Sequence, residues 1–215
     1  MSPAPAAAGA WIAPEGGQEI LTSTYGERNE TSVYESAVYY EAPLDEDNAL
    51  VFAPWGETNF DTVEGWRAEA TFGLKHVFYR EGRDIMAVQA GALWISHPEG
   101  ECEEGGAELR WLGGRSFGET GFLNVETAAR ALSGGCEGTR MDISAGYRPA
   151  QNWLAMAQIF ADAPVEGDET VKAQLNIVRF GRSGRGIQLG VRARIDGGEL
   201  EPTLVLGLWG RADED

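Results

Sequence analysis

The sequence has 215 residues, is 43% hydrophobic and carries a formal net charge of −17 at pH 7. A chain this acidic is not expected to bind nucleic acid, because phosphate binding requires a basic surface. It has no apolar run of the roughly 18 residues that a membrane-spanning helix needs, which excludes a helical membrane protein but leaves a β-barrel open. Its 29 glycines, 7 tryptophans and weak helical periodicity favour an all-β fold of short strands and turns.

The amino terminus, residues 1–10, is rich in proline and alanine and lacks the basic and apolar regions of a signal peptide. We interpret it as the stump beside a cleavage site, followed by one barrel domain over residues 11–209 and an acidic tail over residues 210–215. If a secretory signal has been removed, the two cysteines lie in an oxidising compartment.

Alternating apolar and polar residues predict the strands. The clearest spans 65–80, where Trp66 and Phe72 share one face while Arg67 and Glu69 share the other. Similar alternation predicts strands over 140–148, 171–178 and 187–195, and weaker alternation predicts them over 18–25, 32–42, 48–52, 83–95, 107–112, 122–132, 153–160 and 203–209. About twelve such strands are typical of a closed antiparallel up-and-down transmembrane β-barrel in the outer membrane of a Gram-negative bacterium.

The connections between these strands predict the orientation. A barrel of this kind places both chain ends and the short turns in the periplasm, with longer loops outside. The outer connections are then 26–31, 53–64, 96–106, 133–139, 162–169 and 196–201, which hold most of the clustered acid. The inner ones are 43–47, 81–82, 113–121, 149–152 and 181–186, most of them compact with arginines nearby.

Cys102 and Cys136 both fall in outer connections and could form a disulfide. Such a bridge would contribute about 3–4 kcal/mol by restricting the unfolded chain. The alternative is two unpaired thiols in a reducing compartment.

The polar strand faces predict a lumen of mixed charge. The expected lumen-lining residues are Arg67, Glu69, Lys75, Glu108, Arg110, Glu126, Arg130, Asp142, Arg148, Lys172, Arg192 and Arg194. These side chains could line a water-filled path whose basic excess favours small anionic or zwitterionic solutes. They could equally interlock as ion pairs and plug a ring of intermediate width, so pore and plug both remain open.

We expect no enzyme and no cofactor. The only histidines are His76, on the expected lipid face, and His97, whose neighbour Ser96 points away from it in an extended chain. The acidic runs 99–104 and 166–169 offer oxygen ligands for weak binding of divalent cations or for cation bridges to lipopolysaccharide phosphates, with plain solvated loops as the alternative.

Several aromatic residues are expected at the membrane interface, near strand ends: Trp66, Phe78, Trp94, Trp111, Tyr147, Trp153 and Trp209. In the competing interpretation they would fill the core of a soluble β-sandwich or of a lipocalin-like binding protein.

Directly before the first expected strand, the chain reads Gly9-Ala10-Trp11-Ile12-Ala13-Pro14-Glu15-Gly16-Gly17-Gln18. This start resembles the mature start of small proteobacterial outer-membrane barrels, some of which are grouped as transporter-like barrels of the MetA-pathway, phenol-degradation type. The carboxyl end departs from the pattern, since residues 210–215 follow the expected terminal aromatic, Trp209.

The resemblance and the polar strand faces together predict a passive channel or transporter for small polar or anionic solutes. Its expected surroundings are outer-membrane lipids and lipopolysaccharide. A structural or partner-binding barrel with a plugged lumen is the alternative within the same fold.

Overall fold

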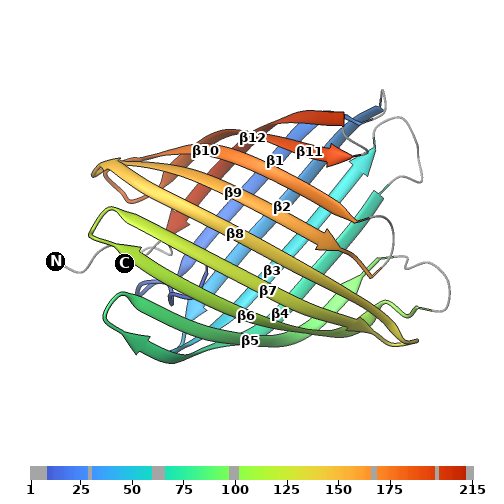
Figure 1. The fold of residues 1–215 in the computed structure, drawn as a ribbon, viewed down its shortest axis with the longest axis horizontal. Coiled ribbons are helices and arrows are strands. Elements are labelled where there is room, and N and C mark those ends of the chain that lie inside the picture. Colours follow the sequence, from blue (N-terminus) through green and yellow to red (C-terminus); the bar gives the residue numbers. More distant parts are fainter. Residues whose placement is uncertain are drawn as a thin grey trace.

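A computed structural model describes residues 9–28, 31–59, 66–96, 102–165, 169–196 and 199–211, which form a closed barrel of tilted strands (Figure 1). The strands are β1 (Gln18–Arg28), β2 (Thr31–Pro43), β3 (Asn48–Asn59), β4 (Trp66–Glu81), β5 (Asp84–Ile95), β6 (Gly105–Phe117), β7 (Gly121–Leu132), β8 (Cys136–Ala150), β9 (Trp153–Ala163), β10 (Thr170–Phe180), β11 (Gly186–Asp196) and β12 (Glu199–Arg211). Each pairs antiparallel with its neighbours in sequence, and β1 closes the ring against β12 with Gln18 opposite Arg211. The predicted all-β, twelve-stranded, up-and-down barrel is confirmed.

All twelve expected segments are strands, but most are longer than expected. The inner connection expected over 113–121 exists, but its expected bounds are wrong. β6 continues to Phe117 and leaves only a turn at 118–120, where Gly118 has a φ of 67°. The outer connection expected over 133–139 is likewise a turn at 133–135. Glycines and charged residues at the strand ends obscure the alternation, while backbone pairing extends the strands as far as a membrane requires.

The pleat gives the barrel an apolar outer face and a polar inner face. Outward side chains such as Leu175, Ile187 and Leu189 are more than half exposed, whereas the inward Lys75 and Glu108 are at most 3% exposed. A water-soluble barrel has polar side chains outside and apolar side chains inside. A sandwich consists of two separate sheets that do not close into one ring. The β-sandwich and lipocalin-like interpretations are therefore wrong, and the exposed belt suits lipid.

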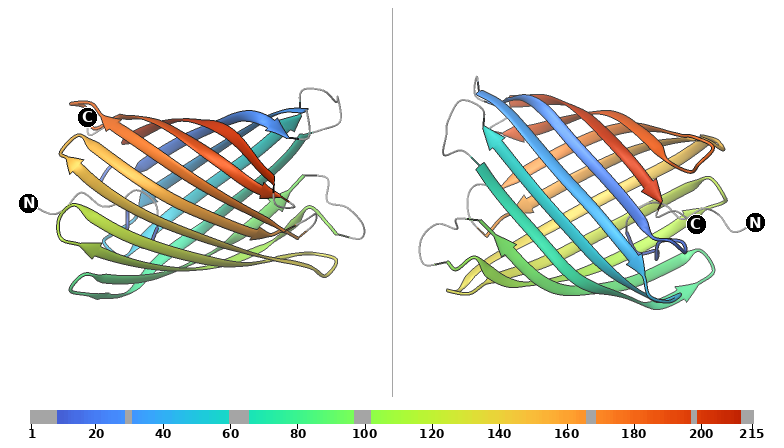
Figure 2. Two further views of the ribbon diagram at one scale, coloured as in Figure 1. Left: turned by 45° about the horizontal axis from the view of Figure 1, so that its top comes forward. Right: turned by 180° about the vertical axis from the view of Figure 1, so that it is seen from behind.

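The start of β1 and the end of β12 lie at the same end of the barrel, together with the turns 44–47, 82–83, 118–120, 151–152 and 181–185 (Figures 1 and 2). We call this the inner end and the opposite one the outer end. At the outer end Cys102 and Cys136 form the expected disulfide, with Cα atoms 5.9 Å apart. Leu93, Ile95 and Leu132 pack beneath it, so that this side of the outer end has a small apolar core.

The described residues contain no helix long and apolar enough to cross a membrane.

The expected interfacial aromatics face outward with one exception. Trp66, Phe78, Trp94, Trp111, Tyr147 and Trp153 are each at least 37% exposed. Trp209 is only 5% exposed and points into the barrel, because Leu206 and Leu208 occupy the outward positions of β12. The expectation that Trp209 lies at the membrane interface is therefore wrong.

Candidate functional site

The lumen of the inner end holds part of the chain itself. Residues 9–17, which we call the N-terminal segment, run inside the barrel before β1 begins. Ala10 is fully buried against Val77, Ile85 and Leu112 of β4, β5 and β6. Trp11 lies over the wall at Gly114, where an added Cβ atom would come within 2.5 Å of the indole ring. The wall is thus shaped to accept this segment.

A buried ion pair ties the N-terminal segment to the wall. The Nζ of Lys75 donates hydrogen bonds to the carbonyl oxygens of Gly9 (3.1 Å) and Trp11 (2.8 Å) and to Oε2 of Glu41 (2.7 Å). The other carboxylate oxygen of Glu41 accepts the backbone N–H of Ala13 at 2.8 Å. A buried charge pair is tolerated only when its remaining hydrogen-bonding capacity is satisfied, and here the segment supplies those partners.

Farther toward the outer end, ion pairs fill the side of the lumen formed by β6, β7 and β8. Arg110 contacts Glu108 at 3.1 Å, Glu126 at 2.8 Å and Asp142 at 3.7 Å. Arg130 contacts the second oxygen of Glu108 at 3.2 Å. These side chains interlock, so the plug interpretation describes this half of the lumen.

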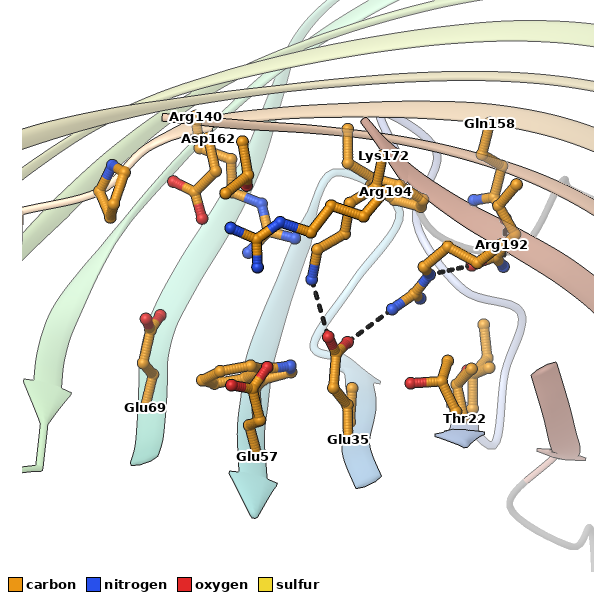
Figure 3. Close-up of a pocket in the computed structure, with 18 of the residues that line it drawn as sticks. Thr22, Glu35, Glu57, Glu69, Arg140, Gln158, Asp162, Lys172, Arg192 and Arg194 are labelled. Carbon is orange, nitrogen blue, oxygen red and sulfur yellow. Dashed lines mark hydrogen bonds and ion pairs between the residues drawn. The ribbon is translucent and has the colours of Figure 1, made fainter. Parts of the chain in front are cut away.

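The other half of the lumen contains a cavity of about 550 Å³, bounded by β1–β4 on one side and β8–β12 on the other. Figure 3 shows the acidic side chains of one wall facing the basic side chains of the other. The acidic lining residues are Glu35, Glu57, Glu69 and Asp162, and the basic ones are Arg67, Arg140, Lys172, Arg192 and Arg194. Asp162 alone among the acids sits on the mainly basic wall, beside Arg140, its register partner.

One acid joins the two walls. Glu35 extends from β2 and contacts Lys172 of β10 at 2.9 Å and Arg192 of β11 at 2.7 Å. Arg192 also donates to Oε1 of Gln174 at 2.6 Å and lies 5.5 Å from the centre of the Phe160 ring. Glu35 therefore forms a charged link that crosses the cavity.

Toward the inner end the lining changes from charged to uncharged side chains. Below the charged residues lies a network of amides, in which Gln174 and Gln188 both donate to Oδ1 of Asn176 at 3.0 and 2.9 Å. The indole N–H of Trp209 then donates to Gln188 at 2.7 Å, while its ring meets Phe180 edge-on at 5.7 Å. A solute entering from the outer end would meet charges, then amides, then an aromatic floor.

The structure separates the expected lumen-lining residues into groups. Arg67, Glu69, Lys172, Arg192 and Arg194 line the cavity, whereas Glu108, Arg110, Glu126, Arg130 and Asp142 lie in the ion-paired half. Glu69 also joins the two groups through its contact with Arg130 at 2.5 Å. Lys75 is covered by the N-terminal segment, and Arg148 lies at the inner end, 5.2 Å from the Phe180 ring.

Four charged lining residues were missed by the sequence analysis: Glu35, Glu57, Arg140 and Asp162. Glu57 and Asp162 lie beyond the expected ends of their strands. Glu35 lies in a strand with polar residues on both faces, so that polarity alone does not identify the inward one. Glu57 and Asp162 could have been found by extending the alternation of each strand past its expected end, in register with the neighbouring strand.

Of the two histidines, only His76 lies among the described residues. His76 faces outward on β4, with Nδ1 2.9 Å from Oδ1 of Asn48. His97 lies outside the described residues, as do most of the acidic runs at 99–104 and 166–169. Within the described ranges no group of three or more His, Cys, Asp or Glu side chains is arranged to hold a metal ion, and cation binding by the acidic runs stays a prediction.

No protein-family model matches the chain, and no curated protein matches it in sequence. Solved structures do match. The KdgM porin has a TM-score of 0.59 at 6% identity, with 88% of this chain and 97% of that chain covered. The COG4313 outer membrane channel from Pseudomonas putida F1 has a TM-score of 0.63 at 10% identity, with 95% and 98% covered. The chain therefore has the fold of small outer-membrane channels, which confirms the resemblance to small outer-membrane barrels at the level of the fold.

Proposed function

We propose that this protein is a passive outer-membrane channel for small polar solutes, with a preference for those that carry negative charge. The observation that supports this most is the 550 Å³ cavity inside the ring, lined by charges on facing walls.

The preference for anions rests on the composition of the cavity wall. The cavity lining contains five basic and four acidic side chains, although the whole chain carries a net charge of −17. A charged lining in a low-dielectric wall concentrates solutes of the opposite sign. A porin of similar fold has been solved in complex with disordered oligogalacturonate, whose units carry carboxylates, which agrees with this direction.

The proposal is tested by incorporating the refolded protein into planar lipid bilayers under a tenfold potassium chloride gradient. We expect discrete current steps and a reversal potential displaced toward the equilibrium potential of chloride. Absence of current from protein that shows barrel circular dichroism would reject the channel, and a displacement toward potassium would reject the anion preference.

A second candidate, the structural or partner-binding barrel, is favoured by one observation. The N-terminal segment and the aromatic floor both narrow the inner end, so the cavity could be a closed vestibule. This alternative predicts no current from the wild-type protein. The two solved structures named above are a porin and an outer membrane channel, and we propose no catalytic activity.

A further inference from the structure

We propose that the cavity contains a binding site for the carboxylate group of a small solute, and that the side chain of Glu35 occupies this site until a solute replaces it. The site consists of Lys172 on β10 and Arg192 on β11, and Glu35 reaches it from β2 across the cavity (Figure 3). The inference rests on the proposed channel function, because it names the group by which the channel would hold a passing solute.

Glu35 presents to the two cations what a solute carboxylate would present. Its Oε1 accepts a hydrogen bond from Nζ of Lys172 at 2.9 Å, and its Oε2 accepts one from the guanidinium of Arg192 at 2.7 Å. Each oxygen of one planar group therefore meets a different charged donor, and such charge-assisted hydrogen bonds are the strong ones. The two donors are arranged for a carboxylate.

The two cations share this single carboxylate. Among the described residues no second acidic side chain contacts Lys172 or Arg192, so the site keeps a positive charge even when Glu35 is bound. The packed half of the lumen is different, because Arg110 alone contacts three carboxylates there. An incoming carboxylate would therefore be attracted to the first group and repelled by the second.

Arg192 is held in place by its own wall. Its Nε donates to Oε1 of Gln174 at 2.6 Å, and its guanidinium lies 5.5 Å from the centre of the Phe160 ring. Gln174 is fixed in turn, because its amide donates to Gln158 at 3.2 Å and to Asn176 at 3.0 Å. None of these contacts involves Glu35, so Arg192 is already oriented for a carboxylate that takes the place of Glu35.

The replacement of Glu35 is accessible and reversible. The side chains of Lys172 and Arg192 are 19% and 16% exposed, and both line the 550 Å³ cavity. Exchanging one carboxylate for another leaves no buried cation without a partner, which removes the main cost of breaking such a link. The displaced Glu35 would lie beside Glu57, its register partner on β3, and repulsion between the two favours its return. Weak binding of this kind suits a solute that must also leave the site.

The test measures the binding of propionate, which has the structure of the end of a glutamate side chain, to the full-length protein in detergent micelles. Saturation-transfer NMR titrations give the dissociation constants, and propionamide serves as the uncharged ligand of similar shape. Glu35→Ala removes the internal competitor and should bind propionate about tenfold more tightly than the wild type, because occupation of the site by Glu35 lowers the apparent affinity. The wild type should bind propionate weakly, and neither protein should bind propionamide.

The matched control is Glu126→Ala, which removes a carboxylate from the packed half, leaves Arg110 with two others and should bind propionate as the wild type does. Glu35→Ala/Arg192→Gln should lose the gain in affinity. Glu35→Gln keeps the volume of the side chain and should show a gain in the same direction, which provides the test if Glu35→Ala does not fold into a barrel.

Three results would overturn the site: no gain in either Glu35 variant, an equal gain in Glu126→Ala, or equal binding of propionamide. A wild type that binds no propionate at concentrations well above those that saturate Glu35→Ala would overturn the replacement of Glu35. Binding in micelles does not require conduction, and current steps in planar bilayers report the channel separately. Either proposal can therefore fail while the other stands.

Discussion

At the scale of single residues, the lumen contains two kinds of charge. Lys75 and Glu41 are almost fully buried and complete each other's hydrogen bonds together with the N-terminal segment. Glu35, Lys172 and Arg192 also form ion pairs, but they do so at the wall of a cavity. The first group should therefore govern stability and the second should govern the passage of ions.

Substituting Lys75→Met should destabilise the barrel by about 3 kcal/mol, because it leaves the Glu41 carboxylate buried without a cation. Urea-dependent unfolding from lipid vesicles, followed by tryptophan fluorescence, measures the change. The double variant Lys75→Met/Glu41→Gln should recover part of the loss, since the uncompensated charge is gone. An unchanged unfolding free energy in the single variant would show that the pair is not buried as described.

Substituting Glu35→Gln should make the channel more selective for anions. The change releases Lys172 and Arg192 from their shared carboxylate and leaves two cations facing the cavity. The reversal potential under a potassium chloride gradient should move farther toward chloride. Glu126→Gln, in the ion-paired half, provides the control and should leave the reversal potential nearly unchanged; equal shifts in both variants would refute the division of the lumen.

The sequence predicted the inner face for the charged lumen residues but left their role open between a pore and a plug. Alternation placed Glu108 and Lys172 on the inner face, as observed. However, the strands show the same alternation in the packed half of the lumen and in the half that holds the cavity. What separates them is which side chains meet across the ring, and Glu35 reaches Lys172 from a position 137 residues away. Such contacts depend on strand tilt and register, which period-two patterning does not encode.

At the scale of elements, the N-terminal segment is the main departure from the sequence analysis. Its residues carried the resemblance to small outer-membrane barrels, yet nothing in their composition indicated that they turn back into the lumen. Gly16 and Gly17, with φ values of 91° and 80°, allow the chain to leave the segment and enter β1. Whether residues 1–10 are a processed stump stays a prediction, because residues 1–8 lie outside the described structure.

Dislodging the N-terminal segment should widen the channel. Gly114→Leu would place a side chain where the Trp11 ring now lies, and the conductance should rise roughly twofold because the segment no longer narrows the inner end. Gly113→Leu is the matched control, because Gly113 faces outward and an added Cβ there has no neighbour closer than 4.0 Å. Single-channel recording compares the two variants, and a larger conductance in both, or in neither, would contradict this role for the segment.

The disulfide should stabilise the outer end without affecting conduction. It joins residues 34 positions apart, and replacing both cysteines by serine should cost about 3 kcal/mol through the added freedom of the unfolded chain. Urea unfolding with and without reductant measures this cost. If the serine variant and the reduced wild type unfold at the same urea concentration as the oxidised protein, the bridge contributes nothing to stability.

At the scale of the whole molecule, the fold was largely predictable and the state of the lumen was not. Strand number, ring closure and the apolar belt follow from local alternation and from the need to pair every backbone group in lipid. Connection lengths were less accurate, as β6 shows by continuing to Phe117. The choice between pore and plug had no single answer in the sequence, because one half of the ring is filled and the other holds a cavity.

The central claim, that one half of the lumen is open and the other is packed, can be tested by cysteine accessibility during bilayer recording. The native cysteines are joined to each other, so an introduced cysteine is the only reactive thiol. Ala37 lines the cavity, whereas Ala128 lies on the packed side opposite Arg110, and each is replaced by cysteine in a separate variant. We predict that a charged methanethiosulfonate reagent reduces the current through Ala37→Cys and leaves Ala128→Cys unchanged; rapid modification of Ala128→Cys with no effect at Ala37→Cys would contradict the account.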